Sequence, residues 1–298
     1  MKFGIGIFPT DQSASPIEVA KAVEELGFES LWVSEHSHMP TATEFPAGGQ
    51  VPRDYCAMLD PFVALTAAAA VTTRIRLGTA ICLVTQRDPI NCAKSVSTLD
   101  LISAGRFELG IGAGWNEVEM QHHRTDPATR FRLMRERVEA MKVLWTQETA
   151  EYHGRLVDFG PSWQWPKPVQ SPHPPVLIGG AGPNVLKRVL TYGDGWMPSV
   201  TPMAVPAMAG RVTPLDELEQ LVPELRNHAE DLGRDRPAVV VTGLPLEESA
   251  LHRLLELNVE RWVLRVPPKP MAEVREALET FAENVRKWGG TLEAPAAD

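Results

Sequence analysis

Glycines at two points of the chain could let a ligand come close to the backbone. The first run is Ile178-Gly179-Gly180-Ala181-Gly182, which lies between an apolar stretch and a segment that reads as a helix. Backbone N–H groups in such a turn can approach an anion, and the N-terminus of the following helix adds a partial positive charge. The run therefore predicts a phosphate-binding turn, with a tight turn that binds no ligand as the alternative.

The second glycine-rich run is Gly110-Ile111-Gly112-Ala113-Gly114-Trp115, at the end of another apolar stretch. Closely spaced glycines indicate that something flat approaches the backbone there, because no side chains stand in the way. The indole of Trp115 could cover one side of that flat group. A plain turn beside a packed tryptophan is the other interpretation.

Histidines are the second kind of residue that could act in catalysis. His36 follows a short apolar stretch, where an imidazole can donate a hydrogen bond or act as an acid or base, although a lone histidine is often structural. His36 and His38 together raise the question of a metal-dependent barrel hydrolase, which needs further ligands at later strand ends. His122 and His123 fall in a loop and His173 precedes a strand. We therefore predict that the chain has no metal site.

These residues need a scaffold that brings their loops together. Strand-like and helix-like segments alternate along the chain, and the expected strands are 2–8, 30–34, 75–83, 107–111, 175–178, 195–198, 239–242 and 261–266. The expected helices are 16–27, 60–71, 89–103, 129–146, 183–192, 215–232, 247–257 and 271–288. This alternation implies parallel strands with right-handed crossovers, and it favours an α/β fold of the (β/α)8 TIM barrel type over an open doubly wound sheet. In such a barrel the chemistry lies on the loops that follow the strands, which is where His36 and both glycine runs fall.

Composition and charge narrow the class of protein further. Residues 1–298 are expected to form one domain with loop insertions, including a small hairpin at 152–159, because no low-complexity linker divides the chain. The net charge of -9 argues against a nucleic acid or an anionic membrane as a partner. No apolar stretch is long enough to span a membrane. The spacing of Cys56, Cys82 and Cys92 indicates reduced thiols and a cytoplasmic protein.

Six segments of the chain share motifs with one known family. They are WVSEH (32–36), IRLGTAI (75–81), GRFELGIGAGWN (105–116), PKPVQ (166–170), PPVLIGG (174–180) and GDGW (193–196). Together they resemble the luciferase-like monooxygenase superfamily, and especially its coenzyme F420-dependent oxidoreductase branch. The resemblance is good over residues 1–200 and fades over 201–298.

This resemblance implies an oxidoreductase that transfers a hydride between the deazaflavin coenzyme F420 and a small organic substrate. It implies that His36 lies near the reactive ring carbon, and that Ala80 and Ile81 form a cis peptide that supports the ring. It also implies further cofactor contacts, from Gly112, Ala113, Gly114 and Trp115 at the ring and from Gly179, Gly180 and Gly182 at the phosphate.

Two alternatives stay open beside this interpretation. An FMN-dependent monooxygenase that uses a separate flavin reductase would carry the same motifs, and a non-catalytic flavin-binding protein is the alternative from another class. Members of the family usually dimerise, so we expect a homodimer. The substrate pocket is expected to be built from loops 37–58, 116–129 and 160–174, the kind of segment that varies most between relatives. Trp163 and Trp165 could line its mouth.

Overall fold

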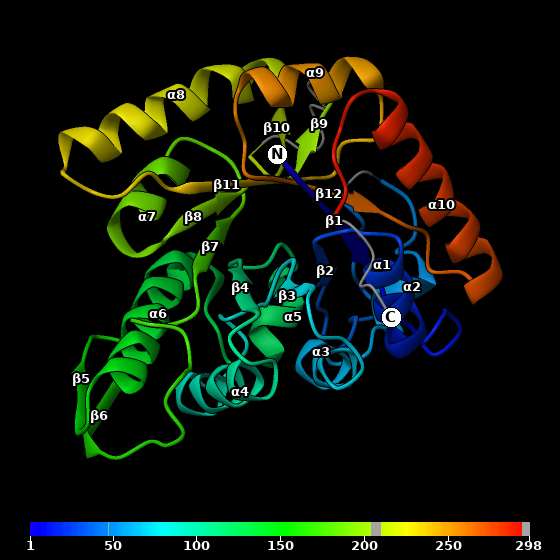
Figure 1. Ribbon diagram of the computed structural model, residues 1–298. Coiled ribbons are helices and arrows are strands. Elements are labelled where there is room, and N and C mark those ends of the chain that lie inside the picture. Colours follow the sequence, from blue (N-terminus) through cyan, green and yellow to red (C-terminus); the bar gives the residue numbers. More distant parts are fainter. Residues whose placement is uncertain (47, 204–209, 294–298) are drawn as a thin grey trace.

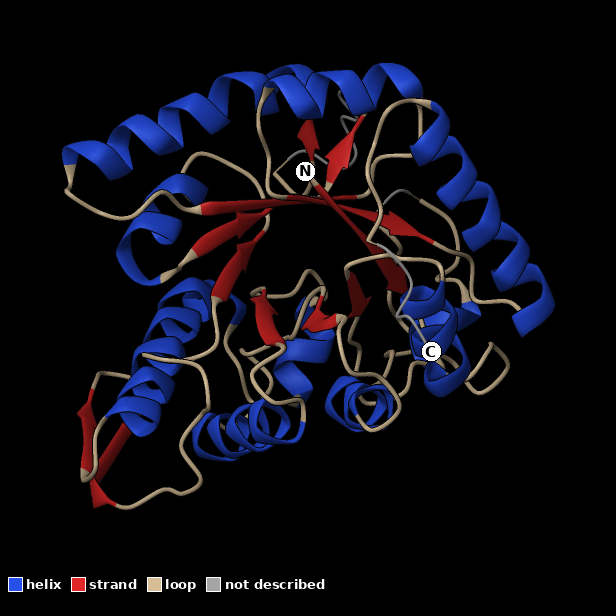
Figure 2. Cartoon of the chain, in the orientation of Figure 1, coloured by secondary structure: helices blue, strands red, loops and turns tan. Residues whose placement is uncertain are grey.

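The structure is a closed barrel of parallel strands surrounded by helices (Figures 1 and 2). The computed structural model describes residues 1–46, 48–203 and 210–293. The barrel strands are β1 (Lys2–Ile7), β2 (Ser30–Val33), β3 (Arg76–Thr79), β4 (Phe107–Ile111), β7 (Val176–Gly179), β8 (Gly195–Met197), β11 (Ala238–Thr242) and β12 (Arg261–Arg265). They close in this order, and β12 pairs with β1 to complete the ring. The architecture confirms the predicted (β/α)8 TIM barrel.

The helices outside the barrel begin where the sequence supplies good capping residues. Ser15 and Glu18 form a capping box at the start of the first helix, and Asp60 and Asp88 each cap a helix whose first turn contains a proline. These side chains accept hydrogen bonds from N–H groups that have no partner within the helix. The helices are α1 (Pro16–Glu25), α3 (Pro61–Ala69), α4 (Pro89–Ile102), α6 (Arg130–Thr146), α7 (Val185–Tyr192), α8 (Leu215–Asp231), α9 (Glu248–Glu256) and α10 (Met271–Lys287).

Several segments expected to be loops contain short elements. Loop 37–58 includes α2 (Arg53–Cys56), and loop 116–129 includes α5 (Glu117–His122) and a 3-10 turn, η1 (Pro127–Thr129). Two further short strands, β9 (Val200–Thr201) and β10 (Thr213–Pro214), pair with each other. These elements are too short to show a hydrophobic period, so periodicity could not reveal them.

The predicted hairpin insertion is present. Strands β5 (Ala150–His153) and β6 (Asp158–Ser162) pair in an antiparallel manner, over a slightly longer span than the expected 152–159. The hairpin lies beside α6 and away from the barrel strands (Figure 2). It is therefore an addition to the barrel rather than one of its strands.

A single indole fills the middle of the barrel. Trp32 is fully buried, and its Nε1 donates a hydrogen bond to the hydroxyl of Ser30 at 2.8 Å. A Cβ atom added at Gly78 would overlap the indole, and one added at Gly4 would overlap the Ser30 hydroxyl. Glycines on the neighbouring strands therefore make room for the tryptophan, as interior layers of small barrels require. The same interior cluster contains Leu177, Met197, Val240 and Val263.

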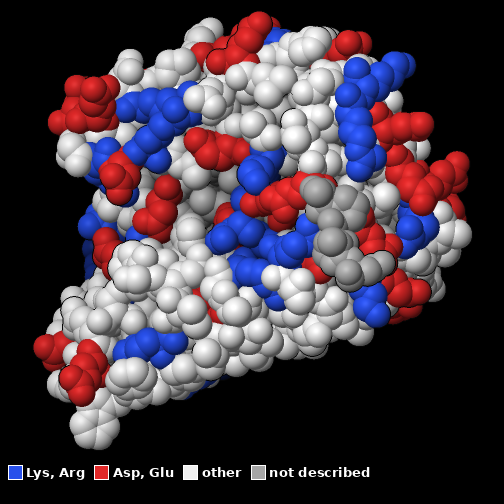
Figure 3. Space-filling model, viewed as in Figure 1, with Lys and Arg blue, Asp and Glu red and all other residues white. Residues whose placement is uncertain are grey.

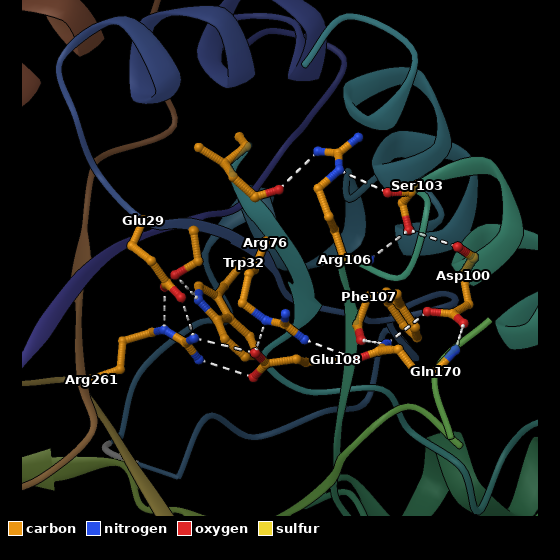
Figure 4. Close-up of polar contacts among 12 residues, drawn as sticks. Glu29, Trp32, Arg76, Asp100, Ser103, Arg106, Phe107, Glu108, Gln170 and Arg261 are labelled. Atoms are coloured by element: carbon orange, nitrogen blue, oxygen red, sulfur yellow. Dashed lines mark hydrogen bonds and ion pairs between the residues drawn. The ribbon is translucent and has the colours of Figure 1, made fainter. Parts of the chain in front are cut away.

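A buried network of charges closes the barrel where its strands begin (Figure 4). Arg261 Nη1 donates to Glu108 Oε2 at 2.9 Å, and Arg261 Nε donates to Glu29 Oε2 at 2.6 Å. Arg76 contacts the same Glu108. Burial disfavours the charge of Arg261, but Glu108 and Glu29 outweigh it and raise the pKa of the guanidinium. Burial likewise raises the pKa of Glu108, but the two arginines outweigh it and hold that pKa below its usual value.

Both ends of the described chain meet at this same end of the barrel. Lys2 Nζ lies 3.0 Å from Glu293 Oε1, and the backbone N–H of Glu293 donates to the carbonyl of Gly27 at 2.8 Å. Positive and negative side chains are intermingled at the centre of the face shown in Figure 3. Within the described ranges, no helix is both long and apolar enough to cross a membrane. Cys56, Cys82 and Cys92 are free thiols.

Replacing Arg261 with Met should destabilise the protein strongly. The change leaves Glu108 buried without its main partner, and breaking a buried ion pair in this way costs about 3–5 kcal/mol. Urea denaturation measures the free energy of unfolding. The control is Arg275→Met, which removes an exposed pair with Glu25 and should cost no more than about 1 kcal/mol. Similar losses in the two variants would show that the network does not stabilise the barrel.

Candidate active site

His36 lies at the opposite end of the barrel, just after β2. Its side chain is only 6% exposed, and its Nδ1 lies 2.9 Å from Oε2 of Glu119. Trp115 Nε1 donates a hydrogen bond to His36 Nε2 at 3.1 Å. Because Nε2 accepts from an indole that can only donate, Nδ1 carries the proton and donates to the carboxylate. The contacts therefore define a neutral imidazole with a fixed orientation.

Glu119 is the buried partner that orients this histidine. Its side chain is fully buried, and its Oε1 accepts a hydrogen bond from the backbone N–H of Ser37 at 3.2 Å. Burial raises the pKa of Glu119, but the hydrogen bond from His36, with smaller contributions from Gln86 and the Ser37 backbone, outweighs it, so the pKa lies below the ordinary carboxyl value. An ionised carboxylate is thus held against the imidazole at neutral pH.

The sequence analysis missed Glu119, although the sequence contains a signal for it. Asn116 caps α5, since its Oδ1 accepts a hydrogen bond from the N–H of Glu119 at 3.1 Å. An asparagine followed three residues later by a glutamate is a common helix-start pattern. Identifying the helix would have placed a carboxylate in loop 116–129, but not its contact with His36, which depends on how β2 and β4 are brought together.

Aromatic rings from loop 37–58 surround His36. The ring of Tyr55 lies 5.5 Å from that of His36 and 5.4 Å from that of Phe8, which follows β1. Phe45 contacts both Tyr55 and Trp115, at 5.3 Å and 6.1 Å between ring centroids. Loop 37–58, which we expect to form part of the substrate pocket, thus lies against His36.

Loop 160–174 does not follow the expectation. Trp163 Nε1 donates to Thr149, and Gln164 donates to the backbone of Ile90 on α4. Trp163 and Trp165 are 79% and 57% exposed. Later in the same loop, Gln170 bonds to Arg76 and Asp100, at the end of the barrel opposite His36. The two tryptophans lie along the outer helices because the loop returns from the hairpin, so the prediction that they line the pocket mouth is wrong.

A second group of polar side chains continues from His36 toward the surface. Ser37 Oγ lies 2.7 Å from His123 Nε2 and 2.9 Å from His38 Nδ1. His38 Nε2 in turn lies 2.8 Å from His122 Nδ1. These histidines are thus engaged with one another and with a serine. Among the described residues, no group of three or more His, Cys, Asp or Glu side chains is arranged to hold a metal ion.

The residues after β3 form a small platform near the barrel axis. The peptide bond between Ala80 and Ile81 is cis, as the family resemblance implied, and Ser34 Oγ donates to the Ala80 carbonyl at 2.8 Å. An added Cβ at Gly112 would overlap Ile81 Cδ1, and one at Gly179 would lie 2.9 Å from Ile81 Cγ2. The structure thus brings together four of the proposed cofactor residues, Ala80 and Ile81 after β3, Gly112 after β4 and Gly179 at the end of β7.

The proposed cofactor residues Ala113, Gly114 and Trp115, which follow β4, differ in their surroundings. Ala113 is buried in the hydrophobic core, and its carbonyl accepts a hydrogen bond from Thr85 at 2.9 Å. Gly114 has a φ of +83°, a conformation that favours glycine. Trp115 contacts His36 as described. The Ala113 side chain is therefore packed in the core and its carbonyl is engaged by Thr85.

The glycine run after β7 leaves its backbone accessible. Gly180 has a φ of +105° and Gly182 a φ of +90°, and an added Cβ at Gly180 would meet no atom within 4 Å. Trp196 Nε1 donates to the Gly180 carbonyl at 3.0 Å, which fixes the turn. The following helix, α7, begins at Val185. The turn thus combines free space, exposed backbone and a helix N-terminus, which together suit a phosphate group.

Comparison with known proteins extends these observations. The model of the luciferase-like monooxygenase family matches residues 1–246, beyond the segments in which motifs were recognised. The chain is 39% identical over 289 residues to the uncharacterized protein Rv0953c of Mycobacterium tuberculosis, covering 95% of this chain and 98% of that protein. It is 31% identical over 185 residues to an F420-dependent glucose-6-phosphate dehydrogenase of Amycolatopsis mediterranei, covering 61% of this chain and 52% of that protein.

Solved structures show the same fold. The monooxygenase RslO1 of Streptomyces bottropensis has a TM-score of 0.78 at 22% identity, with 96% of this chain and 99% of that chain covered. An F420-dependent secondary alcohol dehydrogenase, in complex with an F420-acetone adduct, has a TM-score of 0.71 at 20% identity, with coverage of 96% and 99%. The oxygenating constituent of a diketocamphane monooxygenase of Pseudomonas putida, in complex with FMN, has a TM-score of 0.64 at 20% identity, with coverage of 81% and 66%.

Replacing Glu119 with Gln should lower stability in a pH-dependent way. At neutral pH the free energy of unfolding should fall by about 1.5–3 kcal/mol, the range for hydrogen bonds to a charged group. Because folding lowers the pKa of Glu119, its contribution is complete above the ordinary value of 4.5 and is lost as pH falls through the folded-state value. Urea denaturation of both proteins, from neutral pH to below 4.5, measures this difference.

The control for this experiment is Glu117→Gln, an exposed acid in the first turn of the same helix. Surface changes of this kind usually alter stability by no more than about 0.5 kcal/mol. The proposed role of Glu119 would be refuted by equal losses in the two variants. A Glu119→Gln loss of the same size at every pH would also refute it.

Proposed function

Because this chain belongs to the luciferase-like monooxygenase family, we propose that it is an oxidoreductase that transfers a hydride between coenzyme F420 and a small organic substrate. The observation that carries the proposal is the buried His36–Glu119 pair, which lies at the same end of the barrel as the Ile81 platform that Gly112 and Gly179 make room for. A bound deazaflavin supplies the hydride chemistry, while the protein supplies binding, orientation and electrostatics.

The residues at the C-terminal end of the barrel fit such a cofactor. Gly180 and Gly182 would present backbone N–H groups to its phosphate, in the open space beside the turn. Gly112 and Gly179 make room for the side chain of Ile81, on which the flat ring of the cofactor would lie. The fit concerns shape and anion binding, which FMN and F420 have in common.

His36 is the residue proposed to handle the proton that accompanies hydride transfer. Its Nδ1 proton is committed to Glu119, so Nε2 is the atom that exchanges a proton with a substrate hydroxyl or carbonyl. Glu119 stabilises the positive charge that forms when Nε2 takes up a proton, as a buried carboxylate does behind a catalytic histidine. Trp115 occupies Nε2 in the structure and must yield this atom to the substrate.

An FMN-dependent monooxygenase served by a separate reductase is the second candidate. It is supported by the FMN complex among the similar structures. Coenzyme F420 is favoured because the relative with 31% identity is named as an F420-dependent dehydrogenase, whereas the FMN complex shares 20% identity and supports the fold alone.

Fluorescence quenching with purified protein tests the choice of cofactor. We expect saturable binding of F420 that is at least about tenfold tighter than that of FMN, a difference of about 1.4 kcal/mol.

In F420 turnover with a panel of small alcohols, His36→Gln should lower the rate by a factor of about 10²–10⁴ and leave F420 affinity nearly unchanged. Tight FMN binding without F420 binding would contradict the proposal. Full activity of the His36 variant would reject the proposed role of the imidazole.

A matched pair of glycine variants tests the phosphate site. Gly180→Ala should weaken F420 binding at least about tenfold, because alanine disfavours the positive φ and its methyl group occupies the space beside the turn. Gly289→Ala is the control, since Gly289 also has a positive φ and open space around it but lies after α10. Unchanged affinity in Gly180→Ala would exclude this turn as the phosphate site.

A further inference from the structure

Arg265 is a second arginine that β12 directs toward the barrel interior. Side chains alternate along a strand, so Arg261, Val263 and Arg265 share one side of β12. Arg261 contacts Glu108 inside the barrel, and Val263 belongs to the interior cluster around Trp32. Arg265 therefore continues this row at the C-terminal end of the barrel, the end at which His36 lies.

The two arginines differ in their partners. Arg261 is surrounded by carboxylates, whereas no carboxylate in residues 1–46, 48–203 and 210–293 forms an ion pair with Arg265. Desolvation lowers the pKa of the Arg265 guanidinium, while Tyr55 has the opposite but weaker effect. The side chain is nevertheless exposed, so a ligand can reach it. A partly desolvated cation without a counter-charge is unfavourable unless a ligand supplies the charge.

Aromatic rings connect Arg265 with His36. The guanidinium carbon lies 4.7 Å from the centroid of the Phe8 ring. Phe8 contacts Tyr55 at 5.4 Å, and Tyr55 contacts His36 at 5.5 Å. If the anionic group of a molecule binds at Arg265, the apolar part of that molecule can pack on these rings and extend toward the imidazole.

The order of strands separates Arg265 from the glycine runs. In the closed ring β12 neighbours β1, which neighbours β2, the strand that His36 follows. The same order puts β4 opposite β12, and β7 next to β4. The glycines proposed to bind the cofactor follow β4 and β7, so Arg265 lies across the barrel from them and on the side of His36.

We propose that Arg265 binds the carboxylate or phosphate group of an organic substrate whose apolar part packs along Phe8 and Tyr55 toward His36. A guanidinium suits this role because its planar fork donates two parallel hydrogen bonds to either anion. This proposal deepens the proposed function. It rests on that function only in placing the reacting end of the substrate at His36. Anion binding at Arg265 itself does not depend on the identity of the cofactor.

Calorimetric titration with benzoate and phenyl phosphate, and with neutral benzamide, tests this proposal. The three probes share a ring that can pack on Phe8 and Tyr55, and only the first two carry a negative charge. Wild-type protein saturated with F420 should bind both anions more tightly than benzamide. Arg265→Gln should weaken the anions at least about tenfold and leave benzamide unchanged, while Arg265→Lys should recover part of the loss. Arg155→Gln, an exposed arginine on the hairpin, is the control and should behave like wild type.

Two further measurements separate the possible explanations. Arg265→Gln should melt at the same temperature as wild type or higher, because it removes an unpaired charge, and a lower melting temperature would indicate a structural role instead. Its F420 affinity should be unchanged, and a loss of F420 binding would assign Arg265 to the cofactor and overturn the proposal. Absence of anion binding in the wild type, or equal anion binding in Arg265→Gln, would also overturn it.

The same titrations without F420 distinguish this proposal from the proposed function. A chain that binds benzoate through Arg265 but binds neither F420 nor FMN would refute the cofactor assignment and leave the anion site standing. A chain that binds F420 normally but shows no Arg265-dependent anion binding would do the reverse.

Discussion

The ion network around Arg261 is the constraint on which the barrel depends. A guanidinium buried inside a protein is costly unless hydrogen-bond acceptors replace the water that it loses, and the carboxylates of Glu108 and Glu29 do so here. These contacts join β12, the last strand, to β4 and to the start of β2. The barrel is closed by this network at one end and filled by Trp32 in the middle, so only the other end is left for a ligand.

At that other end, polar groups are held in place and remain available to a ligand. His36 is fixed by Glu119 and Trp115, yet its Nε2 can exchange a proton once the indole moves. Arg265 has no carboxylate partner within the described part of the chain, although it is the same kind of residue as Arg261 on the same strand. The contrast between the two ends of β12 separates a charge that stabilises the fold from one that is available to a substrate.

Much of the fold was predictable because each repeat carries its own local signals. Apolar stretches, capping residues such as Asp60 and Asp88, and the glycine after β7 are all visible in short windows of sequence. Contacts between distant parts of the chain were not visible in such windows, since Glu119 reaches His36 only after the barrel closes. Arg265 was overlooked for the same reason, because its contact with the Phe8 ring depends on the pairing of β12 with β1. Loop 160–174 was misplaced because the hairpin redirects it along the outer helices.

A crystal structure of the chain with bound F420 tests the central claim most directly. The account predicts that the phosphate contacts the backbone of Gly180 and Gly182, and that the ring lies on the Ile81 platform with His36 beside its reactive carbon. It also predicts that the guanidinium of Arg265 stays free of the cofactor and faces the remaining space. A phosphate bound at Arg265, or a ring held away from His36, would contradict the account.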